Sequence, residues 1–359
     1  MNYHIILHQE TDLQLQAEQA KHGKSPRHCM FQLAQALGAS IHAPHSRLKI
    51  RKRDRVRSKL LGAPENWALA REIVETTGPE DVIFCNSETS GLPIAALCRG
   101  RQDRPKIAVF THNINRPRAR IALRLLQATS HVDWFLACSQ AQSNFIQEYL
   151  NLPEEKATFV WDQTDLNFFS PGPVSPQKKR PLIMSVGLEK RDYRTLAAAT
   201  ADLPVDVKIS GFSRDARVLA KAFPEVLPDN MSQQFYEWAD LLQLYRDADV
   251  VVVSTFPNRY AAGVQAMMES MACGRPTVVT CTEGLQHYLS DNDGVIQVPP
   301  GDPAAMRQAI VRLLEHPEEA AHLSQRASLL VKERHDSDVF VERMKKGLEA
   351  LGAGLSTKI

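Results

Sequence analysis

The stretch that decides the fold is VVVVSTFPNRYAAGVQAMMESMACGRP, residues 250–276. Its four consecutive valines form an apolar run of the kind found in strands that are buried on both faces of a parallel sheet. Pro257-Asn258 then turns the chain, and a loop of small residues leads into a helical pattern. A strand that feeds a helix in this way is typical of α/β domains.

Apolar runs alternate with helical patterns along both halves of the chain. In the first half we expect strands at Tyr3–Leu7, Asp81–Cys85, Ala95–Cys98, Ile107–Thr111 and Trp134–Ser139, and helices near Pro26–Leu37 and Ala119–Ala128. In the second half we expect strands at Leu182–Val186, Val205–Ile209, Val250–Ser254, Thr277–Thr280 and Val295–Val298, and helices at Thr195–Ala201, Leu241–Asp247, Gln265–Cys273 and Val339–Leu351. Each half should therefore fold as a Rossmann-like α/β domain.

The boundary between the two halves is expected at Ser170–Pro181. This segment, SPGPVSPQKKRP, holds four prolines, one glycine and three basic residues, which can neither pack a core nor continue a helix. Two domains also agree with the length of 359 residues, because one domain typically has about 100–200. We therefore divide the chain into domains at residues 1–172 and 173–335, followed by a last segment at 336–359.

The composition excludes several classes of protein. Lysine plus arginine (43) nearly balances aspartate plus glutamate (41), so no nucleic-acid partner is expected. The six cysteines form no C-x-x-C pair and no cluster at metal-ligand spacing, so neither a zinc site nor a redox site is expected, and a cytoplasmic location fits. The N-terminus lacks the pattern of a signal peptide, and no window approaches the roughly 20 apolar residues of a membrane span.

One segment, Ser46–Leu60, has an unusual charge. It carries eight lysines or arginines against one aspartate, with apolar residues between them. Such a cluster could bind an anionic lipid surface or an acidic acceptor. The alternative is a solvated flexible face without a partner. Any membrane contact would be peripheral.

The start of the helix that follows the quoted strand is a candidate anion site. Unpaired amides at a helix N-terminus carry the positive end of the helix dipole, and Ala262-Gly263 would let a phosphate approach the backbone. Glu269 would lie about a turn and a half further along, where a carboxylate can accept both hydroxyls of a ribose. The alternative is that Gly263 is a turn glycine and Glu269 a surface charge.

Longer motifs around this helix resemble the donor half of retaining GT-B glycosyltransferases, particularly family 4. They are ESMACGRPTVVT (269–280), Glu283-Gly284-Leu285, VPPGDPAAMRQAIVRLL (298–314), MSVGLEKRDYRTLAAA (184–199) and DLLQLYRDADVVVVS (240–254). The first half is similar to the family through AVFTHN (108–113), FLACSQAQSNFI (135–146) and VWDQTDLNFFSP (160–171). The resemblance implies two facing Rossmann-like domains with a central cleft, and a C-terminal helix that crosses back to the N-terminal domain.

The resemblance also implies a donor site in the second half. The donor-binding residues would be Gly187, Arg191, Gly211, Phe212, Ala262, Gly263, Val264 and Glu269, with Arg191 and Lys190 neutralising the leaving diphosphate. The family has a second glutamate eight positions before the ribose glutamate, and this chain has Ala261 there. Because alanine cannot hydrogen-bond a sugar hydroxyl, a catalytically silent nucleotide-sugar-binding module is an alternative to an enzyme.

Acceptor-side residues are expected in the first half. His112 and Asn113 follow a strand at the edge where ligands collect in open parallel sheets, and His112 is a candidate catalytic residue, although a lone histidine is more often structural. Gly23 and Lys24 lie where the family has a glycine-rich loop. Asp165 is expected to be a turn or hinge residue.

The function that we expect is retaining transfer of a sugar from a UDP- or GDP-sugar to a glycan, lipid or small-molecule acceptor. No cofactor and no metal are expected, since no D-x-D pair lies beside a plausible donor strand. A nucleotide-sugar epimerase can share this architecture, but it would need an acid/base constellation that the sequence does not show.

Overall fold

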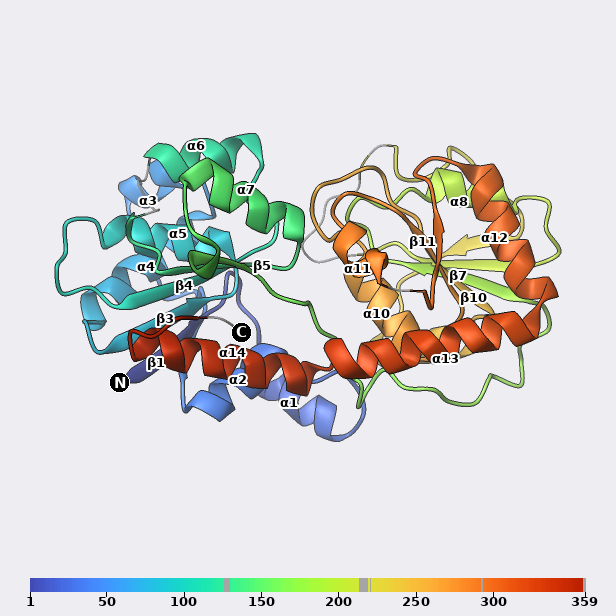
Figure 1. Cartoon of the computed structure of the whole chain (residues 1–359), viewed down its shortest axis with the longest axis horizontal. Helices are drawn as coiled ribbons and strands as arrows, with labels where there is room; N and C mark the ends of the chain where they lie inside the picture. The colour runs from blue at the N-terminus through green and yellow to red at the C-terminus, as the bar shows by residue number, and fades with distance from the viewer. Residues whose placement is uncertain (126–129, 213–218, 220, 292, 358–359) are drawn as a thin grey trace. The chain divides into compact units, whose positions relative to one another are not determined.

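The computed structural model describes residues 1–125, 130–212, 219, 221–291 and 293–357. The chain divides into two compact units (Figure 1). Unit 1 consists of Met1–Ala17, His28–Trp161 and Asp338–Ile359, and unit 2 of Glu18–Arg27 and Asp162–Ser337.

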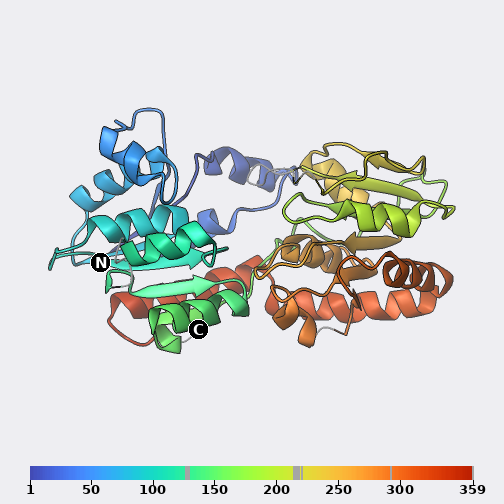
Figure 2. The same ribbon diagram turned by 90° about the horizontal axis from the view of Figure 1, so that it is seen from above.

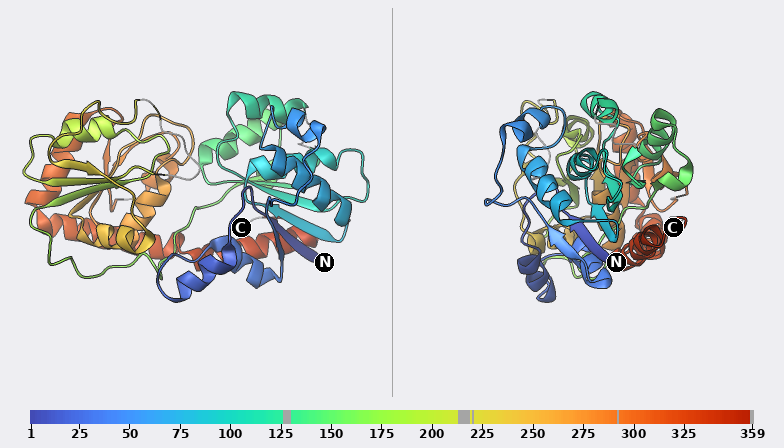
Figure 3. Two further views of the ribbon diagram at one scale, coloured as in Figure 1. Left: turned by 180° about the vertical axis from the view of Figure 1, so that it is seen from behind. Right: turned by 90° about the vertical axis from the view of Figure 1, so that its left-hand side faces the viewer.

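Unit 1 is built on a parallel sheet of six strands in the order β2-β1-β3-β4-β5-β6. The strands are β1 (Asn2–Ile6), β2 (Ser40–His42), β3 (Asp81–Cys85), β4 (Lys106–Thr111), β5 (Trp134–Ala137) and β6 (Ala157–Phe159). The helices are α1 (Leu13–Lys21), α2 (Cys29–Leu37), α3 (Lys52–Arg57), α4 (Pro64–Thr76), α5 (Glu88–Leu97), α6 (Pro117–Leu125), α7 (Gln140–Leu150), the short 3-10 helix η2 (Glu154–Lys156) and α14 (Ser337–Gly352). Helices cover both faces of the sheet (Figures 1 and 3).

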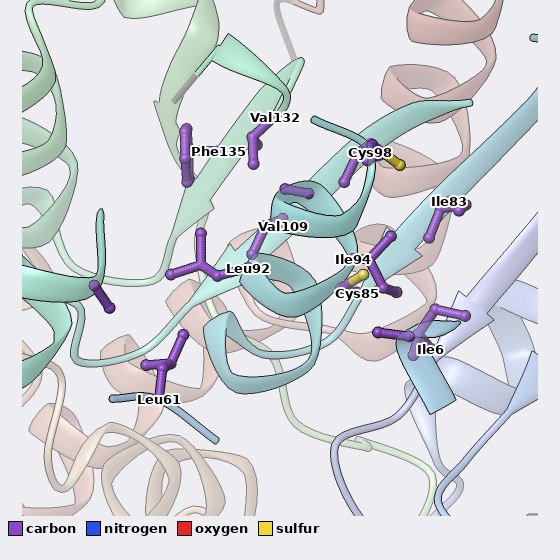
Figure 4. Close-up of a cluster of buried hydrophobic side chains, with 14 of the residues drawn as sticks. Ile6, Leu61, Ile83, Cys85, Leu92, Ile94, Cys98, Val109, Val132 and Phe135 are labelled. Atoms are coloured by element: carbon purple, nitrogen blue, oxygen red, sulfur yellow. The ribbon is translucent and has the colours of Figure 1, made fainter. Parts of the chain in front are cut away.

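Alternation along the strands of unit 1 sends side chains to two layers of the core. Val109 of β4 packs with Leu92 and Ile94 of α5 in one hydrophobic cluster (Figure 4), and Ile107 and residues of α4 belong to the same cluster. A Cβ at Gly91 of α5 would lie 2.6 Å from Cγ2 of Val109, so only glycine allows this close packing of helix on strand. On the other face, Phe110 meets Phe340 of α14 edge to face, with ring centroids 6.4 Å apart.

Unit 2 is built on a second parallel sheet of six strands, in the order β12-β11-β10-β7-β8-β9. The strands are β7 (Leu182–Val186), β8 (Asp206–Ser210), β9 (Met231–Gln233), β10 (Val250–Val253), β11 (Thr277–Thr280) and β12 (Ile296–Val298). The helices are α8 (Tyr193–Thr200), α9 (Trp238–Asp247), α10 (Val264–Ala272), α11 (Gln286–Ser290), α12 (Pro303–Glu315) and α13 (Pro317–Arg334). Helix α8 packs with α12 and α10 packs with α13, and helices cover both faces of the sheet (Figure 2).

The four valines of the quoted stretch form β10, in the middle of the unit 2 sheet, and none is more than 1% exposed. The expected fold class is confirmed: the chain folds as two Rossmann-like α/β units, and its C-terminal helix α14 packs on unit 1. The expected strand at Ala95–Cys98 is wrong, because these residues end helix α5. That helix begins after Ser87, whose Oγ accepts from the backbone N–H of Thr89.

The segment of residues 170–181 belongs to unit 2, and the boundary along the chain lies before it, between Trp161 and Asp162. Its backbone is held by acidic side chains of the unit. The carboxylate of Asp247 accepts from Ser175 N and Oγ at 2.7 Å, and Asp249 accepts from Lys178 Nζ at 2.7 Å. Prolines and lysines that suggested a linker therefore line the surface of a folded unit.

Asp165 ties an N-terminal segment into unit 2. Its carboxylate accepts from Arg27 N at 2.7 Å, Nε at 2.9 Å and Nη2 at 2.8 Å. It also accepts from Asn167 N at 3.1 Å, which closes the turn that the sequence suggested. Asp165 is thus both a turn residue and the buried half of an ion pair with the partly exposed Arg27, which holds residues 18–27 in the unit.

Candidate functional site

The carboxyl ends of parallel strands meet at one edge of the unit 2 sheet, and the predicted donor residues follow these ends. Gly187 follows β7, Gly211 follows β8, and Gly263 begins the helix after β10. Backbone hydrogen bonds join the loops: Arg191 bridges to Thr255, and Phe256 N donates to the carbonyl oxygen of Lys190 at 2.8 Å. The loops after β7 and β10 therefore form one continuous surface.

Arg191 is a buried cation in this surface. Its side chain is 4% exposed, and the guanidinium donates to the carbonyl oxygens of Val186 (Nε, 2.7 Å) and Glu189 (Nη1, 3.0 Å). No carboxylate forms an ion pair with it in the part of the chain that the structure describes. Since a buried charge is costly without a counter-ion, this arrangement is suited to an anionic ligand.

Two glycines flank the guanidinium of Arg191. A Cβ at Gly187, where φ is +95°, would lie 2.6 Å from Nη2. A Cβ at Gly263, where φ is +99°, would lie 3.5 Å from Nη1 and 2.7 Å from Cγ1 of Val253. Both positions require a residue without a side chain, because φ is positive and the space is taken. The two glycines thus leave room for the guanidinium of Arg191 between the loops.

Lys190, the second predicted cation, is placed differently. It adopts a left-handed conformation with φ of +55°, and its side chain is half-buried. Its ammonium group makes no ion pair within the described ranges. The structure therefore brings Arg191, more directly than Lys190, to the start of α10.

The start of α10 has open backbone donors, but they differ from the expected set. No side chain caps the helix at Gly263. Of the three expected amides, Ala262 N donates to Tyr260 O at 2.7 Å and Val264 N to Ala261 O at 3.1 Å. Gly263, Gln265 and Ala266 have N–H groups with no acceptor among the residues described. An anion would be bound by these three, about one residue later than the sequence suggested.

Glu269 lies further along α10, and Tyr245 of α9 donates to its Oε2 at 2.6 Å. Burial raises the pKa of Glu269 to about 7, while the hydrogen bond from Tyr245 and the charge of Arg191 act in the opposite direction. Burial and the neighbouring carboxylate raise the pKa of Tyr245 well above its usual value. Oε1 of Glu269 has no partner among the described residues, so it can accept a ligand hydroxyl.

Tyr245 was not found from the sequence. It lies in a helix of mixed composition, and only the fold brings its hydroxyl to 2.6 Å from Oε2 of Glu269, 24 positions later. Phe235 was missed for a similar reason, because the three-residue strand β9 was not expected. Phe235 is 59% exposed and meets Phe212, 47% exposed, edge to face at 5.7 Å, beside the predicted base-binding residue Gly211.

In unit 1, His112 follows β4 and its imidazole is fixed by neighbouring loops. Nε2 lies 3.1 Å from the carbonyl oxygen of Asn86, Nδ1 lies 3.9 Å from Sγ of Cys138, and the ring packs on Phe110. Because a carbonyl oxygen only accepts, the neutral ring carries its hydrogen on Nε2. Nδ1 is then the basic nitrogen.

The remaining acceptor-side predictions fall in different units. Asn113 lies beside His112 in unit 1, whereas Gly23 and Lys24 belong to unit 2. Gly23 has φ of +66° with open space around it, and Lys24 is exposed. The structure thus does not gather these four residues into one unit.

The basic segment at residues 46–60 includes α3 and presents most of its charge to solvent. Arg47, Lys49, Arg51, Lys52, Arg53, Arg55 and Lys59 are exposed. Its one acid, Asp54, is fully buried: it accepts from Arg51 N at 2.7 Å and pairs with Arg71 at 2.9 Å. The single negative charge therefore does not offset the exposed positive ones.

None of the helices described has the length and apolar character that crossing a membrane would require.

Comparisons with known proteins point to one family. Residues 194–316 match the family model described as glycosyl transferases group 1. No curated protein sequence matches the chain.

Solved structures are similar over nearly the whole chain. Sucrose-phosphate synthase from Thermosynechococcus elongatus has a TM-score of 0.73 at 17% identity, and the match covers 99% of this chain and 100% of that one. HepE from Anabaena, in complex with UDP-glucose, has a TM-score of 0.68 at 16% identity, over 98% and 100%. An α,α-trehalose-phosphate synthase (UDP-forming) from Burkholderia vietnamiensis has a TM-score of 0.73 at 15% identity, over 98% of each chain. The chain thus has the GT-B fold, and residues 194–316 of its second unit are similar to the glycosyl transferases group 1.

Proposed function

We propose that the protein is a retaining glycosyltransferase that takes its sugar from a UDP- or GDP-sugar and needs no metal. The observation that carries this proposal is the buried guanidinium of Arg191, which forms no ion pair in the described structure and lies beside the start of α10, where backbone amides are open. A departing nucleoside diphosphate needs fixed positive charge, which these groups would supply.

The other donor contacts follow from the same surface. Glu269 would accept ribose hydroxyls through Oε1, and the exposed rings of Phe212 and Phe235 would lie against the base. HepE is known as a complex with UDP-glucose, and this favours a UDP-sugar for the present protein. Retention of the anomeric configuration is proposed from the resemblance of the donor half to retaining enzymes.

A second candidate is a nucleotide-sugar-binding protein without turnover. It is favoured by Ala261, a 9% exposed residue at the position where the family has a glutamate near the sugar. Such a protein would keep the diphosphate and ribose contacts but lack a carboxylate at the transferred sugar. Binding without product would then be the observed behaviour.

Incubation with a panel of UDP-, GDP- and ADP-sugars and candidate acceptors tests the proposal. We expect nucleotide release with at least one pair, undiminished in EDTA, and a product whose NMR anomeric coupling matches that of the donor. Binding of a donor without release for any pair would support the second candidate. Interconversion of the donor sugar itself would instead indicate an epimerase.

We also propose a peripheral contact between residues 46–60 and an anionic membrane. It is supported by seven exposed lysines and arginines and by Val56, which is 63% exposed among them. Replacing Arg51, Arg53 and Arg55 by glutamine should reduce sedimentation with phosphatidylglycerol vesicles. Equal sedimentation of parent and variant, or none for the parent, would contradict this contact.

A further inference from the structure

Four consecutive backbone amides of unit 1 are bound by two buried side chains. In the segment after β4, His112 N and Asn113 N donate to the two carboxylate oxygens of Glu88 at 3.0 and 3.3 Å. Ile114 N and Asn115 N both donate to Oε1 of Gln142, at 2.9 and 3.2 Å. We call residues 112–115 the His112 loop. The acceptors are side chains of α5 and α7 and not backbone carbonyl groups, so the loop depends on Glu88 and Gln142.

Both side chains are unusual in being polar and buried. Glu88 is 2% exposed and Gln142 is inaccessible. Glu88 is the first residue of α5, where the positive end of the helix dipole favours a carboxylate. Its charge is also met by Nη2 of Arg116 at 3.3 Å. A buried carboxylate with this many donors is held in one orientation.

Arg116 closes the loop from outside. Its Nε donates to the carbonyl oxygen of Asn113 at 2.9 Å while Nη2 reaches Glu88, although the side chain is 49% exposed. Asn113 is therefore bound through both its N–H and its carbonyl group. The backbone of the loop cannot rotate there without breaking contacts to Glu88 and Arg116.

The orientation of His112 follows from this backbone. The backbone N–H of His112 donates to Glu88, and the ring of the same residue lies 3.1 Å from the carbonyl oxygen of Asn86 through Nε2. That ring contact puts the hydrogen on Nε2 and leaves Nδ1 basic. Loss of the Glu88 contact would free the ring to rotate and to exchange tautomers.

We propose that Glu88, assisted by Gln142, is a positioning residue that holds the His112 loop and fixes the tautomer of His112 for the acceptor. The role in transfer rests on the function proposed above, whereas the hold on the loop can be measured without turnover. Glu88 does not itself touch substrate in this proposal.

The first test compares Glu88→Gln with the parent protein. The amide side chain keeps one acceptor but turns a donor toward a backbone N–H, so at least one loop hydrogen bond is lost. Hydrogen exchange of the peptide containing residues 112–115 should become about tenfold faster. The imidazole nitrogen signals of His112 should move from the Nε2–H form toward a mixture of tautomers.

Two further variants make the result decisive. Arg116→Gln changes a side chain that is half exposed, so the variant should fold. The imidazole signals of His112 should shift in the same direction as in Glu88→Gln, but by a smaller amount. Glu148→Gln removes a carboxylate from an exposed site in α7 and should change nothing. If both Glu88→Gln and Arg116→Gln keep the parental exchange rate and imidazole signals, the positioning role is refuted.

The kinetic arm separates positioning from the proposed transfer. For the best donor and acceptor of the panel, Glu88→Gln should lower kcat about tenfold while the Kd for UDP stays unchanged, because the donor residues lie in unit 2. An unchanged kcat with altered His112 signals would overturn the role in transfer. If the parent transfers no sugar, the proposed function fails. Hydrogen exchange and the NMR signals of His112 still test whether Glu88 holds the loop, because neither measurement needs turnover.

Discussion

Replacing Glu269 by glutamine should stabilise the protein, relative to the parent, more at neutral pH than at acidic pH. Burial raises the pKa of this carboxyl from 4.5 to about 7. Because the folded state keeps its proton to a higher pH than the unfolded state, the carboxyl lowers the free energy of unfolding as the pH rises from 4.5 to 7. A shift of one pKa unit corresponds to about 1.4 kcal/mol, so the free energy of unfolding is lower by about 3 kcal/mol above pH 7 than below pH 4.5.

Glutamine removes this titration and keeps an oxygen that can accept from the Tyr245 hydroxyl. The free energy of unfolding of Glu269→Gln, minus that of the parent, should therefore rise by about 3 kcal/mol between pH 4.5 and pH 8. The pKa values of His28 and His42 are lowered by burial and change stability in the opposite sense, but they contribute equally to both proteins and cancel in the difference.

Urea unfolding at several pH values, followed by circular dichroism, measures this difference. Glu315→Gln, at an exposed position in the same unit, is the matched control and should show no change with pH. A difference for Glu269→Gln that is the same at pH 5 and pH 8 would refute the reasoning, because it would mean that the carboxyl titrates alike in the folded and unfolded chains.

Three other changes have defined outcomes. Glu269→Ala should weaken UDP binding about tenfold in calorimetry without loss of the circular dichroism of the fold, and an unchanged Kd would remove Glu269 from the site. Gly263→Ala puts a Cβ 2.7 Å from Val253 at a positive φ, so it should lower the free energy of unfolding by roughly 1–3 kcal/mol; parental stability would show that the loop relaxes freely. Asp165→Ala removes the carboxylate that accepts from Arg27 and should cost roughly 1–3 kcal/mol in urea unfolding, whereas an unchanged free energy of unfolding would mean that the ion pair is dispensable.

The sequence predicted the parts of the fold that depend on neighbouring residues. Four valines followed by a turn and a small-residue loop correctly predicted β10 and α10, since a fully apolar strand and a helix start are both local signals. The wrong prediction of a strand at Ala95–Cys98 also came from a local signal. These apolar residues suit a strand, but the helix that begins after the cap at Ser87 ends with them.

The site was less accessible to prediction because its contacts are long-range. No local pattern showed that Tyr245 would donate to Glu269, or that Glu88 would accept the amides of a loop 24 residues later. The occupied amides of Ala262 and Val264 likewise depend on how the loop before α10 folds back on itself. Metal independence and a cytoplasmic location stay predictions.

The central claim is that the surface around Arg191 binds a nucleoside diphosphate, and titration of UDP into the parent protein and Arg191→Gln tests it most directly. Glutamine removes the charge that faces the open amides of α10. The account predicts saturable binding to the parent and a Kd at least about tenfold higher for the variant. Equal Kd values, or no binding of UDP to the parent at millimolar concentration, would contradict it.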